Sequence, residues 1–207
     1  MSKTSPSQQK IILDLCGGTG SWSKPYKEAG YDVRLVTLPD LDVRTYEPPE
    51  GVYGILAAPP CTMFSFARTK AVKPRNLQEG MEIVKACLEI IWKCQSQITN
   101  DAGKTSPLKF WALENPNGML KWFLGKPAFE FNPFDFGDQY KKRTHLWGDF
   151  EEPIKNPTHP QPLAVLPKFD RLLTKEIHPE YYGIYDRTTR RAITPPKFAK
   201  AFFEANR

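Results

Sequence analysis

Apolar residues in the first half of the chain fall into short continuous runs separated by polar, glycine-rich or proline-rich segments. Runs at residues 10–15, 31–38, 54–58 and 109–113 have the length and composition of buried strands. Residues 77–98 instead carry apolar side chains at helical spacing, which predicts a long helix. Strands that alternate with helices predict an α/β fold with a mainly parallel sheet and helices on both faces.

The remaining expected elements are shorter. A helix is expected over residues 23–29, before Gly30. Residues 129–136 and 144–147 predict strands near a sheet edge, and residues 151–167 form a proline-rich, irregular excursion. The chain then returns to a predicted helix over residues 196–206.

Composition limits the classes of protein to consider. The 207 residues include 29 Lys and Arg against 23 Asp and Glu, a net charge of +6 that is compatible with a polyanionic partner. Four cysteines without Cys-x-x-Cys spacing and three histidines argue against a structural zinc site or a disulfide framework. The polar N-terminus and the lack of a long apolar run predict a soluble, cytoplasmic protein.

A glycine-rich turn follows the first predicted strand. Asp14 ends that strand, and Gly17, Gly18 and Gly20 allow the backbone to approach a ligand closely. Two interpretations stay open, a nucleotide-type cofactor site or a tight turn that needs glycine. Asp42, just beyond the second strand, could accept a hydrogen bond from an adenine amine or a ribose hydroxyl, or could be a solvated loop residue.

A cysteine lies directly behind two prolines at the end of the third run. Cys61 follows Pro59 and Pro60, so it is expected in a loop at the carboxyl end of a strand, where open α/β folds bind ligands. A thiol there can act as a nucleophile if its surroundings activate it. The alternative is a structural cysteine in an ordinary turn.

Glu114 ends the fourth run, where a half-buried carboxyl would have a raised pKa and could share a proton with a substrate. The alternative is a helix start, with Asn115 as the cap and Pro116 in the first helical turn. Farther along, the alternate residues of an extended segment share one face, which would group Gln139, Lys141 and Arg143 and could include His145.

These segments, in this order, resemble the DNA cytosine-C5 methyltransferase family. Segment 14–20 (Asp-Leu-Cys-Gly-Gly-Thr-Gly) is similar to its S-adenosylmethionine loop, and 42–43 (Asp-Val) to its acidic-aliphatic pair near adenine. Segment 59–65 (Pro-Pro-Cys-Thr-Met-Phe-Ser) looks like the nucleophile loop. Segments 114–116, 139–143 and 191–195 resemble the family's Glu-Asn-Val, Gln-x-Arg-x-Arg and Arg-x-Leu-Thr motifs.

The resemblance implies a Rossmann-like, S-adenosylmethionine-dependent methyltransferase fold and a set of roles. Cys61 would add to carbon 6 of a cytosine flipped out of DNA, Glu114 would protonate ring nitrogen N3, and Arg143 with Lys141 would bind the base oxygen O2. The chain is then expected to bind DNA as a monomer, without a metal. The residues implied to bind S-adenosylmethionine are Asp14, Cys16, Gly17, Gly18, Gly20, Trp22, Asp42, Val43 and Pro59.

The resemblance also divides the chain. Residues 1–148 would form the catalytic domain, 149–189 a reduced target-recognition segment, and 190–207 a C-terminal helix that returns to the catalytic domain. A segment this short predicts short or relaxed sequence specificity. Two alternatives stay open, the same chemistry on a free cytidine nucleotide, or a catalytically silent nucleic-acid-binding module.

Overall fold

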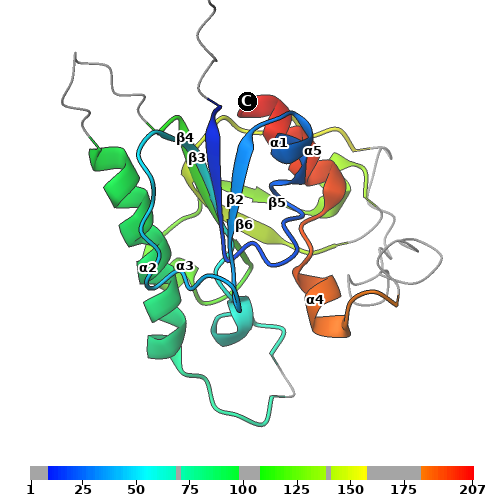
Figure 1. Ribbon diagram of the computed structural model, residues 1–207. Helices are drawn as coiled ribbons and strands as arrows, with labels where there is room; N and C mark the ends of the chain where they lie inside the picture. The colour runs from blue at the N-terminus through cyan, green and yellow to red at the C-terminus, as the bar shows by residue number, and fades with distance from the viewer. Residues whose placement is uncertain (1–8, 69–70, 98–107, 139–140, 158–182) are drawn as a thin grey trace, which may run out of the picture.

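The computed structural model describes residues 9–68, 71–97, 108–138, 141–157 and 183–207. Its centre is a six-stranded sheet of order β2-β1-β3-β4-β6-β5 (Figure 1). The strands are β1 (Ile11–Leu15), β2 (Asp32–Val36), β3 (Val52–Ala57), β4 (Phe110–Pro116), β5 (Phe129–Phe131) and β6 (Thr144–Asp149). β1 pairs in parallel with β2 and β3, and β3 with β4, whereas β6 is antiparallel to β4 and β5.

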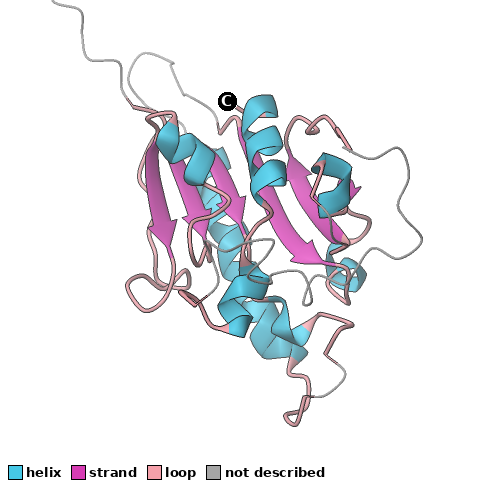
Figure 2. Cartoon of the chain, turned by 90° about the vertical axis from the view of Figure 1, so that its right-hand side faces the viewer, coloured by secondary structure: helices cyan, strands magenta, loops and turns pink. Residues whose placement is uncertain are grey.

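Helices cover both faces of this sheet, as Figure 2 shows. The long helix α2 (Leu77–Ser96) lies on one face, and α1 (Lys24–Glu28) and α5 (Pro196–Ala205) lie on the other. Successive side chains of a strand point to opposite faces. Leu13 of β1 therefore joins the core under α2, while Ile12 joins an aromatic-rich core under α1 and α5. The expected Rossmann-like α/β fold with a mainly parallel sheet is confirmed.

The order of the strands places a crevice at the end of β1. The chain passes from β1 to β2 on one side and then to β3 on the other side, so the loops that follow β1 and β3 diverge. Ligands of open α/β sheets bind at such a switch point, outside the carboxyl ends of the strands. The amide N–H of Ala58 donates to the carbonyl of Leu15 over 2.9 Å, so the two loops start side by side.

Several predicted boundaries differ from the structure. β4 does not stop before Glu114 but continues through Pro116, because its pairing with β6 extends that far. The alternative of a helix capped by Asn115 is wrong, since α3 (Lys121–Leu124) begins later. The expected strand over residues 129–136 is β5 followed by a 3-10 turn, Pro133–Phe136.

The C-terminal part contains one unexpected helix, α4 (Arg187–Ala192), whose N-cap Asp186 accepts a hydrogen bond from the amide of Thr189 over 2.6 Å. The predicted C-terminal helix is confirmed as α5. Of the proposed recognition segment, residues 158–182 lie outside the described residues.

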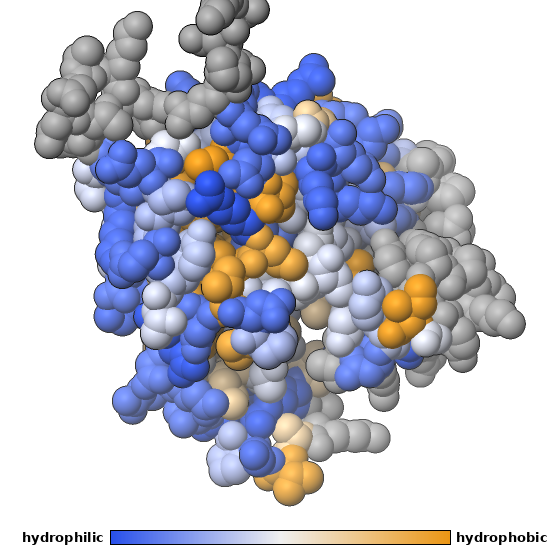
Figure 3. All heavy atoms as spheres, in the orientation of Figure 1, coloured by the Kyte–Doolittle hydropathy of each residue, from blue (hydrophilic) through white to orange (hydrophobic). Residues whose placement is uncertain are grey.

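The surface seen in Figure 3 is mostly polar, with apolar side chains gathered near the middle of the view.

No helix in the described ranges is long and apolar enough to span a bilayer. In the same ranges, no group of three or more His, Cys, Asp and Glu side chains is arranged to hold a metal ion.

Candidate functional site

The turn after β1 depends on left-handed backbone conformations. Cys16, Gly18 and Gly20 have φ values of 57°, 55° and 69°. The amide of Gly20 donates to the carbonyl of Gly17 over 2.9 Å, which closes the turn. A Cβ at Gly17 would lie 2.3 Å from the Asp14 carboxyl, so that carboxyl occupies the space a side chain would need. The glycines at this turn are therefore required by its geometry.

Asp14 is fully buried at the base of this turn. Its Oδ2 accepts a hydrogen bond from the Ser23 hydroxyl at 2.5 Å, while Oδ1 has no partner within the described residues. Burial raises the pKa of Asp14 to about 6, and the Ser23 hydrogen bond opposes that rise. A buried acceptor without a donor is uncommon in folded proteins, so Oδ1 suits a donor group on a bound molecule.

The Cys16 side chain points away from the turn towards α2. A hydrogen bond with the Cys87 thiol lowers the pKa of Cys16 and raises that of Cys87 well above its ordinary value. Cys16 also packs against the core under α2. Its contribution to the turn is therefore made by its backbone.

The loop after β2 brings a second carboxylate near the turn. Asp42 accepts hydrogen bonds from the backbone and side chain of Arg44, which lower the pKa of Asp42 to about 2. Its negative charge also reaches Cys16, whose thiol pKa it raises. Asp42 is thus an ionised acceptor beside the turn, whereas the Val43 side chain is buried in the core under α2.

The Trp22 side chain lies in the aromatic core under α1 and α5. Its ring is 2% exposed and packs against Phe198 and Phe202 of α5, with ring centroids 6.0 and 5.4 Å away. The structure therefore places this ring in the aromatic core and not at the surface of the glycine turn.

The loop that carries Cys61 is fastened to β4. The side-chain amide of Asn115 donates to the carbonyl of Pro59 over 2.9 Å in a buried position. Farther along, the amide of Met119 donates to the carbonyl of Phe64 over 2.8 Å, and Ser65 forms a bridge with Gly118. The loops after β3 and β4 are thus joined at both ends, and Cys61 begins a 3-10 turn (Cys61–Met63) between these attachments.

Cys61 and Glu114 face the same point at this edge. Burial raises the pKa of the Cys61 thiol, and the Glu114 carboxylate raises it further. Burial likewise raises the pKa of Glu114, as predicted for a half-buried carboxyl at a strand end. Two cations oppose these shifts, since Lys142 acts on both groups and Arg191 acts on Cys61. The site therefore combines a thiol, a carboxyl and two positive charges.

The basic residues predicted for the site, Lys141, Arg143 and His145, do not face Cys61. Arg143 donates to the Glu130 carboxylate through Nε at 3.0 Å, and the Nε2 of His145 lies 3.7 Å from the same carboxylate. Arg143 and His145 therefore do share a face, but that face meets Glu130 on the edge strand β5. Lys141 is exposed. The structure does not bring Lys141 or Arg143 against Cys61 in this state.

Sequence reasoning missed Lys142. It grouped Gln139, Lys141 and Arg143 on one face of an extended segment and so left out Lys142, whereas the strand predicted from Thr144 is confirmed as β6. The Nζ of Lys142 donates to the carbonyl of Arg191 over 3.2 Å, which links the segment before β6 to the end of α4. Arg191 could have been found from the sequence, because it begins segment 191–195, which resembles a family motif. The amide of Thr194 in this segment donates to the Ser21 hydroxyl over 2.9 Å, which connects the segment to the glycine turn.

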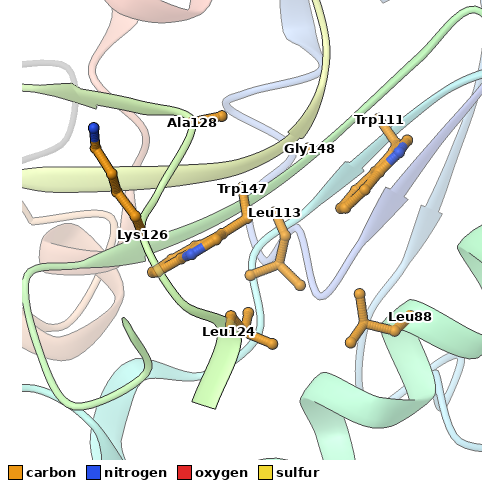
Figure 4. Close-up of a pocket in the computed structure, with 8 residues that line it drawn as sticks. All are labelled: Leu88, Trp111, Leu113, Leu124, Lys126, Ala128, Trp147 and Gly148. Carbon is orange, nitrogen blue, oxygen red and sulfur yellow. The ribbon is translucent and has the colours of Figure 1, made fainter. Parts of the chain in front are cut away.

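A cavity of about 300 Å³ lies apart from these residues, between α2, α3 and the sheet (Figure 4). None of the predicted site residues lines it. Its described lining is mainly apolar and includes Leu88 of α2, Trp111 of β4 and Trp147 of β6. The candidate site is therefore the edge with Cys61 and the glycine turn.

Comparisons with known proteins give no close relative. No family model matches the chain, and no curated protein matches it. One similar solved structure is a candidate DNA modification methyltransferase encoded within a prophage (E. coli), with a TM-score of 0.43 and 14% identity over 68% of this chain and 47% of that chain.

Two further solved structures are similar at the same level. Entamoeba histolytica methyltransferase EhMeth has a TM-score of 0.39 and 9% identity over 75% of this chain and 58% of its own. A Spodoptera frugiperda DNMT2 mutant has a TM-score of 0.38 and 18% identity over 74% and 52%. The chain spans about half the length of these proteins. At these scores the similarity carries no argument about activity.

Proposed function

We propose that the chain transfers a methyl group from S-adenosylmethionine to carbon 5 of cytosine in DNA, through a covalent Cys61 adduct at carbon 6. The observation that carries this proposal is the pairing of a thiol and a carboxyl at one edge of the sheet. Cys61 follows β3, Glu114 lies in β4, and the charge of Glu114 acts on the thiol. The glycine turn lies beside them at the end of β1.

This pair suits the chemistry that cytosine needs. Carbon 5 is a poor nucleophile until a thiolate adds to carbon 6 and leaves negative charge on the ring. The raised pKa of Glu114 favours its protonated form, which can donate to N3 and take up that charge. Carbon 5 then takes the methyl group and gives up its proton to water, Cys61 leaves as the thiolate, and N3 returns its proton to Glu114.

Substrate binding also activates the thiol. Without substrate, burial and the Glu114 carboxylate keep the pKa of Cys61 raised. N3 of the bound base is an acceptor and favours the protonated form of Glu114, and in that form Glu114 carries no negative charge that opposes the thiolate. Lys142 and Arg191 then act on Cys61 unopposed by Glu114 and favour ionisation. Lys142 thus favours the thiolate, next in sequence to the Lys141 and Arg143 that the family resemblance assigned to the base oxygen O2.

The residues around the glycine turn fit S-adenosylmethionine. Asp14 has a free acceptor atom within the described residues, Gly18 has open space where a side chain would stand, and Asp42 is an ionised acceptor beyond β2. These groups would hold the amino, carboxyl and sugar portions through hydrogen bonds. When bound there, the cofactor supplies an electrophilic methyl group.

Transfer of tritium tests the proposal. The protein is incubated with methyl-tritiated S-adenosylmethionine and, in separate reactions, duplex DNA, single-stranded DNA and dCMP. We expect label in DNA, and bisulfite sequencing should place it on cytosine. Label in dCMP alone would replace DNA by a free nucleotide as the substrate. Label in none of the three would contradict an enzymatic function and favour a silent binding module.

A further inference from the structure

Two aromatic rings are exposed next to the proposed active site. Phe66 is 44% exposed and Trp122 is 63% exposed, and their ring centroids lie 5.9 Å apart at an interplanar angle of 57°. Phe123 beside them is 48% exposed and contacts the buried Phe64 with its ring edge. Grouped large apolar side chains at a surface mark an interaction site.

The same loops carry this aromatic pair and the nucleophile. Phe66 follows Cys61 by five residues, and Trp122 lies in α3, eight residues after Glu114. The bridge between Ser65 and Gly118 joins these loops one residue before Phe66 and four residues before Trp122. A Cβ at Gly118 would lie 2.5 Å from the Phe64 carbonyl oxygen, so this junction is close-packed. The rings therefore have a fixed position relative to Cys61.

The segments that carry the rings are rich in lysine and arginine. Lys121 places its Nζ 5.9 Å from the centre of the Phe66 ring. Arg75 donates to the carbonyls of Met63 and Ser65 over 2.9 and 2.8 Å, which holds its guanidinium against the loop. The sequence contains no Asp or Glu from 61 to 78 or from 115 to 129, while it contains Arg68, Lys73 and Lys126.

Exposed rings within positive charge match the two parts of a nucleic acid strand, its bases and its phosphates. Bases offer their faces to a protein ring when they are unpaired, whereas in a duplex they stack on each other. An apolar protein partner would have no need for the surrounding cations.

We propose that Phe66 and Trp122 stack on unpaired bases that flank the target cytosine, so that single-stranded DNA is the preferred form of the substrate. This inference rests on the proposed function, because it names the form of DNA offered to Cys61. Lys121 and Arg75 contribute by attracting the phosphates of the same strand.

Binding of a labelled strand tests the platform without any catalysis. A fluorescein-labelled oligonucleotide of about 12 nucleotides, within the range of single-strand site sizes, is titrated with Cys61→Ser protein in the absence of a methyl donor. The same background carries Trp122→Ala, Trp122→Phe, or Trp92→Ala. Trp92 is the matched control, because it is 55% exposed on α2 and away from this edge.

We expect Trp122→Ala to weaken single-strand binding about ten-fold, the size typical of one lost base stack. Trp122→Phe should restore most of the affinity, since a phenyl ring still stacks, and Trp92→Ala should bind as the parent does. The single strand should also bind more tightly than the same sequence as a duplex.

Equal binding by Trp122→Ala and its parent, or tighter binding of the duplex, would overturn the inference. Either result leaves the proposed function to be judged by tritium transfer. Conversely, the parent protein could transfer no methyl group while Trp122→Ala still weakens binding of the single strand. That pair of results would support stacking on Phe66 and Trp122 and reject the cytosine chemistry. The two claims therefore fail separately.

Discussion

At the scale of single residues, the proposed reaction needs Cys61 as a nucleophile and Glu114 as an acid, and the pKa values of both groups lie above their ordinary ranges. Cys61→Ser keeps the shape of the side chain but replaces the thiol with a much weaker nucleophile. We expect methyl transfer to fall by on the order of 10³-fold or more, as when other nucleophiles are removed. Cofactor binding, measured by equilibrium dialysis, should stay within about two-fold of the parent, because Cys61 lies outside the glycine turn.

A matched variant separates this effect from general damage. Cys94→Ala removes a buried thiol from α2 and should leave the transfer rate unchanged, although it creates a small cavity. Loss of cofactor binding in Cys61→Ser would count against the nucleophile role.

Asp14 makes stability depend on pH. Its folded pKa of about 6 lies above the ordinary value of 3.8, so the folded state binds more protons between these values. Stability should therefore fall as the pH rises from about 4 to 7, by roughly 3 kcal/mol for a shift of about two units. Asp14→Asn should remove this share of the pH dependence in urea unfolding measured at several pH values.

Asp42→Asn is the control for that pH dependence. Arg44 lowers the pKa of Asp42 to about 2 from its ordinary value of 3.8, so Asp42 is almost fully ionised in both states above about pH 5. The stability of this variant should therefore keep the parent's dependence on pH between about 5 and 7. Parent and Asp14→Asn proteins whose stabilities change in parallel across this window would contradict the raised pKa of buried Asp14.

At the scale of elements, the hydrogen bond from Asn115 to Pro59 connects β4 to the loop of Cys61. Asn115→Ala removes a buried donor and leaves the Pro59 carbonyl without it, which should cost about 1–3 kcal/mol of unfolding free energy. The transfer rate should fall as well, because the thiol is no longer held in position. Both are measured on one preparation, by urea unfolding and by tritium transfer.

Asn132→Ala distinguishes positioning from stability. Asn132 caps the 3-10 turn after β5 through a capping box, far along the sheet from Cys61. Its loss should also reduce stability, by about 1 kcal/mol, but should leave the transfer rate of the folded protein intact. Equal losses of rate in both variants would mean that Asn115 acts only on stability.

The elements show how far the sequence can predict this fold. The pattern of apolar positions was sufficient for β1 and β3, which are continuous runs buried on both faces, and for α2, which carries apolar side chains at helical spacing. It failed at Glu114 to Pro116, where pairing with β6 extends the strand although proline usually ends one. It also missed α4, whose residues Arg-Thr-Thr-Arg-Arg-Ala have no apolar repeat.

The candidate site, like the fold, could be predicted from the sequence only in part. Cys61, Glu114 and the glycine turn could be predicted because each follows or ends a strand, and parallel strands bring their carboxyl ends to one edge. The cations that act on Cys61 could not be predicted in this way. Lys142 reaches Cys61 and Glu114 through tertiary contacts between the segment before β6 and the end of α4, which no local pattern records.

At the scale of the whole molecule, the net charge of +6 predicts that the proposed DNA binding weakens as salt increases. Lys121→Ala should reduce the slope of log affinity against log salt by about 0.7 for a single strand, the loss of one phosphate contact. Lys85→Ala is the control, because Lys85 lies on α2 and pairs with Glu89 at 2.5 Å. An unchanged slope in Lys121→Ala would remove this lysine from the DNA surface.

The most direct test of the central claim is to trap the Cys61 adduct. DNA that contains 5-fluorocytosine is incubated with the protein and S-adenosylmethionine, and the products are separated by denaturing electrophoresis. Fluorine at carbon 5 cannot leave as a proton does, so the bond between Cys61 and carbon 6 should persist as a protein–DNA adduct. We expect the adduct with the parent protein and none with Cys61→Ser. An adduct that persists in Cys61→Ser, or methylated cytosine formed without any adduct, would contradict the account.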